Sequence, residues 1–583
     1  MRAELAIATR GTGATPFARE RSARRRIDRF ELAVLGVFAA VSVWVLALDL
    51  WQVVAHGRVW TGTDGFFVID QLQYLAWIRD ASHHVLASNL FVLRPTPSDY
   101  FQPAIAISGA LSALGVAPWL ALLLWKPVAV AGAFFGVRAY ARRSLTRRPE
   151  RRAALALGLF FGSFTVVYGS FGVIGDLFPG FLSWGYPFGL MALAAMAFAL
   201  LAYDRARSAG TLSFTPALLG ALASSLHPWQ GEVLILVVLG AELLSRRDWA
   251  RTRSRLMLPG VTVLATGVPL LYYAILGRFD LSWGLAREAA MHSFPLWSIA
   301  LALAPLALPA AFAYRHRPLS FLGTLTRAWP IAALVVYAVS ASGVSATPLH
   351  AFEGITVPLA VLAVEGVGRI DWRLAPGRRQ ARGSAPGWRR APIGWAACLR
   401  PSRRLVGWLL VAAATIPASA YELGTARDFM APTPGNANFI TGDEGRALAY
   451  LSHDHDAGGV LTRFYLGALV PAQTGRRTFV GNCAWSEPRC TPRAKRAQRL
   501  FDGSLTPRAA RRFVSRSGAR FVLADCESGA DLTGPLAPLT VSVHRFGCAT
   551  VYELAATGPS AAPLTESPVH AAVRAPRGQQ RRA

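Results

Sequence analysis

Two carboxylates in a polar segment after the first long apolar stretch are the strongest candidates for chemistry in this sequence. Asp64 and Asp70 lie within 61–91, in a chain that holds 33 acidic residues against 61 lysines and arginines. A carboxyl group beside an apolar, partly dehydrated surface has a raised pKa, which makes it a better proton acceptor near neutral pH. Ionisable groups are costly to place next to a bilayer and are functional candidates by default. We therefore predict a general base in this segment.

The residues that follow Asp70 have the spacing of an amphipathic helix. At about 100° per residue, Asp70, Tyr74 and Trp77 share one face with Gln73 and His84, and the leucines at 72, 75 and 86 lie opposite. We expect this helix to lie on the membrane surface, with its apolar side toward lipid and its polar side toward a cavity. An interfacial helix with aromatic anchors and no catalytic role fits the spacing equally well.

The composition is that of a membrane protein that crosses the bilayer many times. Of 583 residues, 53% are hydrophobic. Apolar runs near the roughly 17–25 residues that a span requires predict about eleven spans. These runs lie at 30–52, 118–140, 153–174, 186–204, 213–227, 229–245, 256–277, 295–314, 328–345, 352–369 and 405–421.

The net charge of +28 comes mainly from arginines in short runs between these apolar segments. Nucleic-acid binding is excluded because the basic residues are split among many loops. Alternate loops are basic, most clearly 142–152, 246–255 and 370–404. The positive-inside rule then predicts a multi-pass protein of the cell membrane with a cytoplasmic N-terminus, and it places 61–91 and all residues after 421 outside.

The same reading divides the chain into four parts. We expect a disordered basic cytoplasmic tail at 1–29, a transmembrane domain at 30–421 with its first extracytoplasmic loop at 53–117, an extracytoplasmic α/β domain at 422–556 and a disordered tail at 557–583. Within the α/β domain we predict strands near 459–462, 477–480, 520–523 and 550–554, and helices near 445–451 and 507–517.

The cysteines agree with this sidedness. Cys483, Cys490, Cys526 and Cys548 all lie in the outer domain, and Cys398 alone lies in a predicted cytoplasmic loop. An even number of cysteines in an oxidising compartment favours disulfides, and the spacings lack the CxxC pair that is typical of zinc sites. We favour the pairs Cys483–Cys490 and Cys526–Cys548, although spacing alone leaves other connectivities open.

The segment Asp70-Gln71-Leu72-Gln73-Tyr74 resembles the acidic motif in the first extracytoplasmic loop of GT-C glycosyltransferases, with Gln71 in place of a second acid. His227-Pro228, and His350 to Glu353 before an apolar Pro-Leu-Ala helix, are also similar to this superfamily. The runs 472–481 and 519–523 resemble its outer domain. The likeness extends over about 30–556 and implies a GT-C-like helical membrane fold with a C-terminal α/β domain.

This resemblance implies transfer of a hexose or pentose from a polyprenyl-phosphate donor to a hydroxyl of a cell-envelope glycan, lipid or protein. Asp70 is then the general base of an inverting displacement. Gln71 and Tyr74 contact substrate, and Arg94 is a candidate cation for the lipid phosphate. Asp64 binds the sugar, orients Asp70 or is itself the base, and its alternative is a structural turn with Gly65. Because Gln71 replaces an acid, either the second acid is dispensable or a metal that two acids would share is absent. No cofactor is firmly predicted, a divalent metal stays possible, and no metal-ligating residue is assigned.

Four further residues are candidates for substrate binding, each with a structural alternative. Asp176 lies in an outer loop beside Trp184 and Tyr186, which could stack on a sugar or anchor at the interface. His227 ends a span, and its alternative is a histidine satisfied by backbone. His350 could bind phosphate, and Glu353 could complement a helix dipole. Lys126 lies within a span, where we expect a structural partner or a kink at Pro127 at least as much as a catalytic role.

Two other classes of protein remain open. A transporter needs polar groups deep in several spans or paired broken helices, whereas the acids here cluster in outer loops. A non-catalytic envelope-assembly protein is compatible with the large outer domain.

Overall fold

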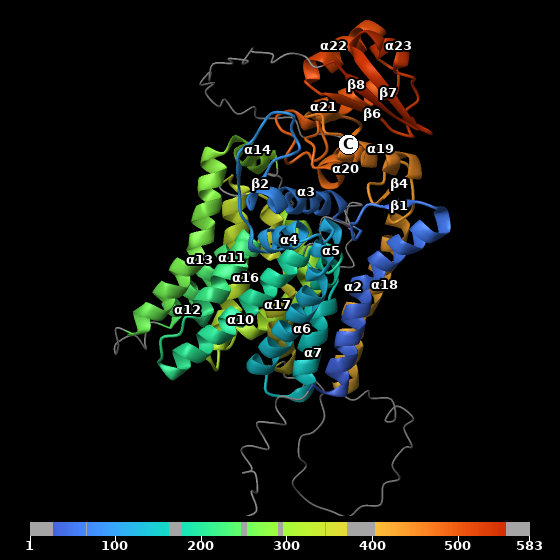
Figure 1. The fold of residues 1–583 in the computed structure, drawn as a ribbon. Coiled ribbons are helices and arrows are strands. Elements are labelled where there is room, and N and C mark those ends of the chain that lie inside the picture. Colours follow the sequence, from blue (N-terminus) through green and yellow to red (C-terminus); the bar gives the residue numbers. More distant parts are fainter. Residues whose placement is uncertain are drawn as a thin grey trace, which may run out of the picture.

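The computed structural model describes residues 27–65, 67–162, 177–245, 254–289, 295–343, 346–369 and 403–555. Nearly all of the two predicted tails, Cys398 and Asp176 lie outside these ranges. Figure 1 shows a bundle of helices with the C-terminal region at one end. We call this the domain end and the opposite one the basic end, because arginines gather there.

Within the described residues, seven helices are long and apolar enough to cross a membrane. They are α2 (Arg29–His56), α5 with α6 (Pro118–Leu123 and Trp125–Ser144), α10 (Pro187–Ala209), α13 (Ser254–Phe279), α15 (Leu296–Tyr314), α16 (Phe321–Ala341) and α18 (Arg403–Phe429). The polytopic helical prediction is confirmed, with a different number of spans.

Four of the predicted spans account for the difference within the described residues, and more than half of one of them, 153–174, lies outside these residues. The helices in these runs are α7 (Arg148–Phe160), α11 (Thr215–Leu226), α12 (Pro228–Leu244) and α17 (Thr356–Arg369). Each is shorter than the roughly 20 residues that a straight span needs. All four pack against longer helices and contribute buried residues to the core of the bundle, whereas Leu218 of α11 and Leu244 of α12 are exposed.

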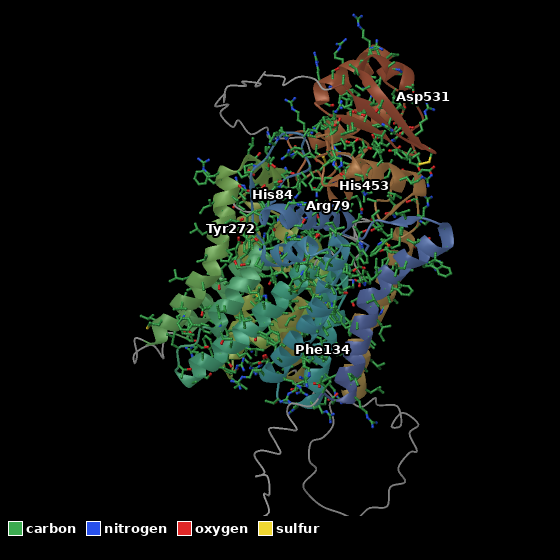
Figure 2. The ribbon with its side chains drawn as sticks, viewed as in Figure 1. Arg79, His84, Phe134, Tyr272, His453 and Asp531 are labelled. Carbon is green, nitrogen blue, oxygen red and sulfur yellow. A yellow bond between two sulfur atoms is a disulfide. The ribbon has the colours of Figure 1, made fainter. Side chains whose placement is uncertain are left out.

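The core of the bundle forms around α10, most of which is buried. Its neighbours are α6, α11 and α12. At the basic end, arginines form ion pairs with acidic residues of neighbouring helices. Arg143 of α6 binds Asp204 of α10 at 2.9 Å, and Arg207 of α10 binds Glu242 of α12 at 2.8 Å. Phe134, labelled in Figure 2, is fully buried within the bundle.

The predicted amphipathic helix is α3 (Val68–His84), which crosses the domain end of the bundle with α4 (Pro103–Ala113) (Figure 1). The prediction that the apolar side of this helix faces lipid is wrong. Leu72 and Leu75 are buried, as is Trp77 on the opposite face. Both faces are covered because α3 lies between the bundle and the C-terminal region, which contacts it through α20 (Phe464–Thr474).

Specific hydrogen bonds join α3 and the loop before it to the C-terminal region. Asn482 donates to the Gln73 side chain at 2.9 Å, and Arg79, labelled in Figure 2, donates to the carbonyl of Ala472 at 2.9 Å. Strand β1 (Val59–Trp60) pairs antiparallel with β4 (Phe439–Ile440). The start of the helix that carries Asp70 is therefore tied at several points. A second short pair joins β2 (Ala87–Ser88) and β3 (Ser98–Tyr100).

The C-terminal region is a mixed α/β unit. Its sheet has the order β5-β6-β8-β7, formed by Val460–Leu461, Phe521–Ala524, Ala549–Leu554 and Thr540–Phe546, with only the β5–β6 pair parallel. Helices α19 (Gly442–His453), α20, α21 (Cys490–Phe501) and α22 (Pro507–Ser517) surround it. Thr506 caps α22 as expected. The predicted strand near 477–480 forms only an isolated bridge at Thr478, and α20, α21 and β7 were not predicted.

Both expected disulfides are present, Cys483–Cys490 and Cys526–Cys548. The second joins the loop after β6 to the turn between β7 and β8. A crosslink between distant parts of a chain stabilises the fold mainly by restricting the unfolded state.

We expect the double variant Cys526→Ser with Cys548→Ser to lose about 2–4 kcal/mol in the stability of the C-terminal region. Thermal unfolding and limited proteolysis of the purified protein measure this loss. Cys398→Ser is the matched control and should leave both measurements unchanged. Equal protease resistance of the double variant and the control would contradict the prediction.

Candidate functional site

A buried ion pair holds the loop in front of α3. Lys126 of α6 binds the Asp64 carboxylate and also donates to the carbonyl of Ser183 at 2.8 Å. The Lys126 and Asp64 side chains are both less than 10% exposed. Asp49 of α2 is fully buried, and its charge interacts with both members of this pair. Burial and pairing favour a structural role for Asp64 over direct contact with substrate, and they give Lys126 the structural partner that we expected.

The same loop is joined to the first turn of α3 and to the segment before α10. The backbone N–H of Asp64 donates to the side chain of Gln71 at 2.7 Å. Gln71 packs directly on Gly185, whose φ of +104° favours glycine and where a Cβ would overlap the Gln71 amide. Gln71 is buried, so its position beside Asp70 serves to fix the helix start.

Asp70 is exposed to solvent, although protein groups surround it. Partial loss of water around the carboxyl group raises its pKa to about 6. The negative charge of Asp70 interacts electrostatically with the hydroxyls of Tyr74 and Tyr186. An accessible carboxylate with this pKa is ionised at neutral pH, and it accepts a proton more readily than an ordinary aspartate does.

The two tyrosines connect Asp70 to a second group of polar residues. The hydroxyls of Tyr74 and Tyr186 hydrogen-bond to each other, and burial raises the pKa of both. The ring of Tyr186 lies 5.8 Å from that of His227 and 5.9 Å from that of His350, measured between centroids. Both hydroxyls remain neutral, so they act as hydrogen-bond donors and acceptors.

His227, His350 and Glu353 form a cluster at the domain end. His227 lies between α11 and α12, and its Nε2 is 3.0 Å from a Glu353 carboxylate oxygen and 3.2 Å from His350 Nδ1. His227 and Glu353 are buried, whereas His350 is partly accessible. Trp229 packs edge-on against the His350 ring, with the centroids 4.6 Å apart. The buried pair of His227 and Glu353 therefore positions the accessible imidazole of His350.

Gly189 in the first turn of α10 allows this cluster to form. A Cβ at this position would overlap the Glu353 carboxylate and the ring of Tyr186. The carboxylate thus reaches His227 only because residue 189 has no side chain.

The structure brings together five of the predicted site residues: Asp70, Tyr74, His227, His350 and Glu353. Asp64 and Gln71 adjoin them but are buried. Arg94 is exposed, and its charge interacts with that of Arg493 in α21. Asp176 lies outside the described residues. The roles predicted for these residues stay predictions.

Sequence reasoning left Tyr186 and Trp229 out of the site, although it named Tyr186 as an aromatic of an outer loop. Each is next to a proline at the start of an apolar helix, Pro187 and Pro228. An aromatic residue at such a helix start, on the same side of the membrane as Asp70, is the signal that could have identified them.

A metal site is not identified at Asp70. Over the described residues, the group of close potential ligands is Asp443 with Cys526 and Cys548, and the two cysteines form a disulfide. A disulfide has no thiolate to offer a metal. The possibility of a metal cofactor stays a prediction.

Gly189→Ala should disturb the site without changing any functional group. We expect a loss of about 1–3 kcal/mol in the free energy of unfolding, because the new methyl group must displace Glu353 or Tyr186. Thermal unfolding in detergent measures the loss. Gly424→Ala is the control, since a Cβ at this position in α18 meets no atom and alanine favours helix. Equal stability of the two variants would contradict the packing.

No protein-family model and no curated protein matches this chain. Its fold is similar to that of the Archaeoglobus fulgidus oligosaccharyltransferase tethered with an acceptor peptide that contains the NVT sequon. The TM-score is 0.51, the sequence identity is 13%, and the match covers 91% of this chain and 74% of that protein. ArnT from Cupriavidus metallidurans bound to undecaprenyl phosphate matches with a TM-score of 0.47 and 13% identity, over 89% of this chain and 98% of ArnT.

At this identity, the likeness to the oligosaccharyltransferase speaks for the fold alone. Together with the helical bundle, the helix α3 across its domain end and the C-terminal α/β region, it confirms the structural similarity to GT-C glycosyltransferases that the sequence predicts.

Proposed function

We propose that this chain is a membrane glycosyltransferase that moves a sugar from a polyprenyl-phosphate donor to an acceptor hydroxyl on the outer side of the cell membrane. The observation that carries the proposal is Asp70: an accessible carboxylate with a pKa of about 6, at the end of a membrane bundle. The GT-C-like fold supports it by analogy.

In the proposed reaction, the Asp70 carboxylate removes the proton of the acceptor hydroxyl while its oxygen attacks the anomeric carbon. The bond between that carbon and the phosphate oxygen breaks, and the phosphate leaves with the electron pair. A single displacement of this kind inverts the anomeric centre. The phosphate is a good leaving group once its charge is stabilised, so it needs hydrogen-bond donors or a cation and no strong acid.

His350 is the best placed group for the leaving phosphate. It is the accessible end of the cluster with His227 and Glu353, and the helix α12 begins beside it at Pro228. The N-terminus of a helix carries partial positive charge, which adds to the attraction for phosphate. Tyr186 lies between this group and Asp70, and its hydroxyl could position the sugar through hydrogen bonds.

This arrangement favours the enzyme over the alternative of a transporter. The accessible residues of the candidate site lie at the domain end, whereas Lys126 and Asp49, which lie deeper in the bundle, are buried together near Asp64. A solute pathway needs polar groups that face water across the membrane. Arg94, on the surface beside α21, is proposed only as an outer contact for the acceptor or for a phosphate.

Asp70→Asn should reduce sugar transfer by about 10²–10⁴-fold, the usual contribution of a general base. The measurement is transfer from a radiolabelled polyprenyl-phosphate sugar in membranes that contain the variant at wild-type level. Asp428→Asn, which removes an exposed carboxylate at the end of α18, is the matched control and should retain activity. Unchanged transfer by a stable Asp70→Asn variant would overturn the assignment of the base.

The pH dependence of the wild type provides an independent measurement. The base must be ionised, so activity is full above a pKa of about 6 and falls as the pH drops below it. We expect transfer at pH 5 to be about tenfold lower than at pH 7. The residual rate of Asp70→Asn should not show this fall. A profile that is flat between pH 5 and 7 in the wild type would contradict the role of Asp70.

A further inference from the structure

A large apolar groove lies in the bundle far from Asp70. It has a volume of about 890 Å³, within the range of roughly 300–1,000 Å³ that ligand pockets occupy. Its walls come from α7, α15, α17 and α18. They include Leu157, Leu306, Val364, Trp408 and Leu410, and the charged residues among the lining are Arg147 and Glu150.

The groove lies at the basic end. Its lining residues belong to the C-terminal halves of α15 and α17 and to the N-terminal half of α18, and Arg147 and Glu150 lie at the start of α7. Arg315 directly follows α15, and Arg369 ends α17. Figure 1 shows α3, which carries Asp70, at the other end of the bundle.

The groove faces lipid and is too apolar to hold water. Both α15 and α18 are candidate spans, and only 11% of the membrane-spanning window of α18 is buried. Leu410 lines the groove and is 53% exposed. A space of this kind inside a bilayer costs dispersion contacts unless a hydrocarbon chain fills it. An acyl chain between α18 and its neighbours supplies the dispersion contacts that protein side chains do not make in the groove.

The charge at its polar end selects the headgroup. Arg147 lies there, paired with Glu150, and Arg148 and Arg152 lie nearby, paired with Asp28. The Arg147 side chain is 78% exposed, and its ion pair with Glu150 spans 3.6 Å, so it is weak and leaves the guanidinium able to bind phosphate. Basic residues at a membrane surface attract anionic lipids.

We propose that this groove, here named the α7–α18 groove, binds one anionic phospholipid of the surrounding bilayer, with an acyl chain between α18 and α15–α17 and its phosphate at Arg147. The proposed sugar donor is not the occupant, because a phosphate at Arg147 lies at the opposite end of the bundle from Asp70. The bound lipid holds α18 against the bundle. This site is independent of the proposed glycosyl transfer.

The test uses the full chain, purified in mild detergent and stripped of lipid. Phosphatidylglycerol or phosphatidylcholine is added, and native mass spectrometry counts the lipids retained. We expect one phosphatidylglycerol to be retained in preference to phosphatidylcholine and to raise the thermal unfolding temperature. Arg147→Ala should weaken phosphatidylglycerol retention by about tenfold, the size of one lost charge-assisted contact. Leu410→Trp should weaken retention by narrowing the groove where the acyl chain lies.

Leu409→Trp is the matched control, because Leu409 is 57% exposed on the same helix and does not line the groove. A photo-reactive phosphatidylglycerol on the wild type is the second measurement and should crosslink to residues 407–414 and 363–368. Equal retention by Leu410→Trp and Leu409→Trp, equal affinity for the two lipids, a co-purified polyprenyl phosphate in the groove, or crosslinks spread evenly over α18 would each overturn the proposal.

Discussion

The arrangement of the candidate site depends on the buried ion pair between Lys126 and Asp64. A lysine inside a membrane-spanning helix is costly without a partner, and here its charge is met by an acid from the adjoining loop. Lys126 also binds the carbonyl of Ser183, and Asp64 is joined through its backbone to Gln71. One interaction therefore fixes α6, the residue next to Asp70 and the segment that leads to Tyr186.

The C-terminal region completes the positioning from the other side. Without the C-terminal region, helix α3 would lie at the membrane interface with one face exposed to water. It is instead enclosed, because β4 pairs with the loop before it and Asn482 and Ala472 bind its polar side chains. An aromatic cluster of Trp77, Tyr100, Trp283 and Trp485 joins the same elements. Asp70 keeps its accessibility while the residues around it are immobilised, which is the combination that a general base requires.

The two ends of the bundle use charge in different ways. At the basic end, arginines pair with Glu31, Asp204, Glu242 and Glu365 and close the helix ends. At the domain end, the candidate site is a hydrogen-bonded group of tyrosines, histidines and carboxylates. The first pattern joins neighbouring helices through ion pairs, and the second gathers polar groups around Asp70 and His350.

Much of this protein follows from the sequence alone. Hydropathy and the arginine runs determined a helical membrane protein, the cysteine positions determined two disulfides, and the spacing of residues 70–84 determined a helix beginning near Asp70. These features are local or compositional, so a single sequence contains them.

The tertiary structure decided the rest. The short apolar helix α17 has the composition of a span, and only its packing shows that most of it is buried inside the bundle. Asp64 and Asp70 are both acids of the same polar segment. Only the structure shows that Asp64 is buried and paired with Lys126, whereas Asp70 is exposed. Contacts between residues hundreds of positions apart, such as His227 with Glu353 or Gln73 with Asn482, are set by how the helices pack, and no local pattern encodes them.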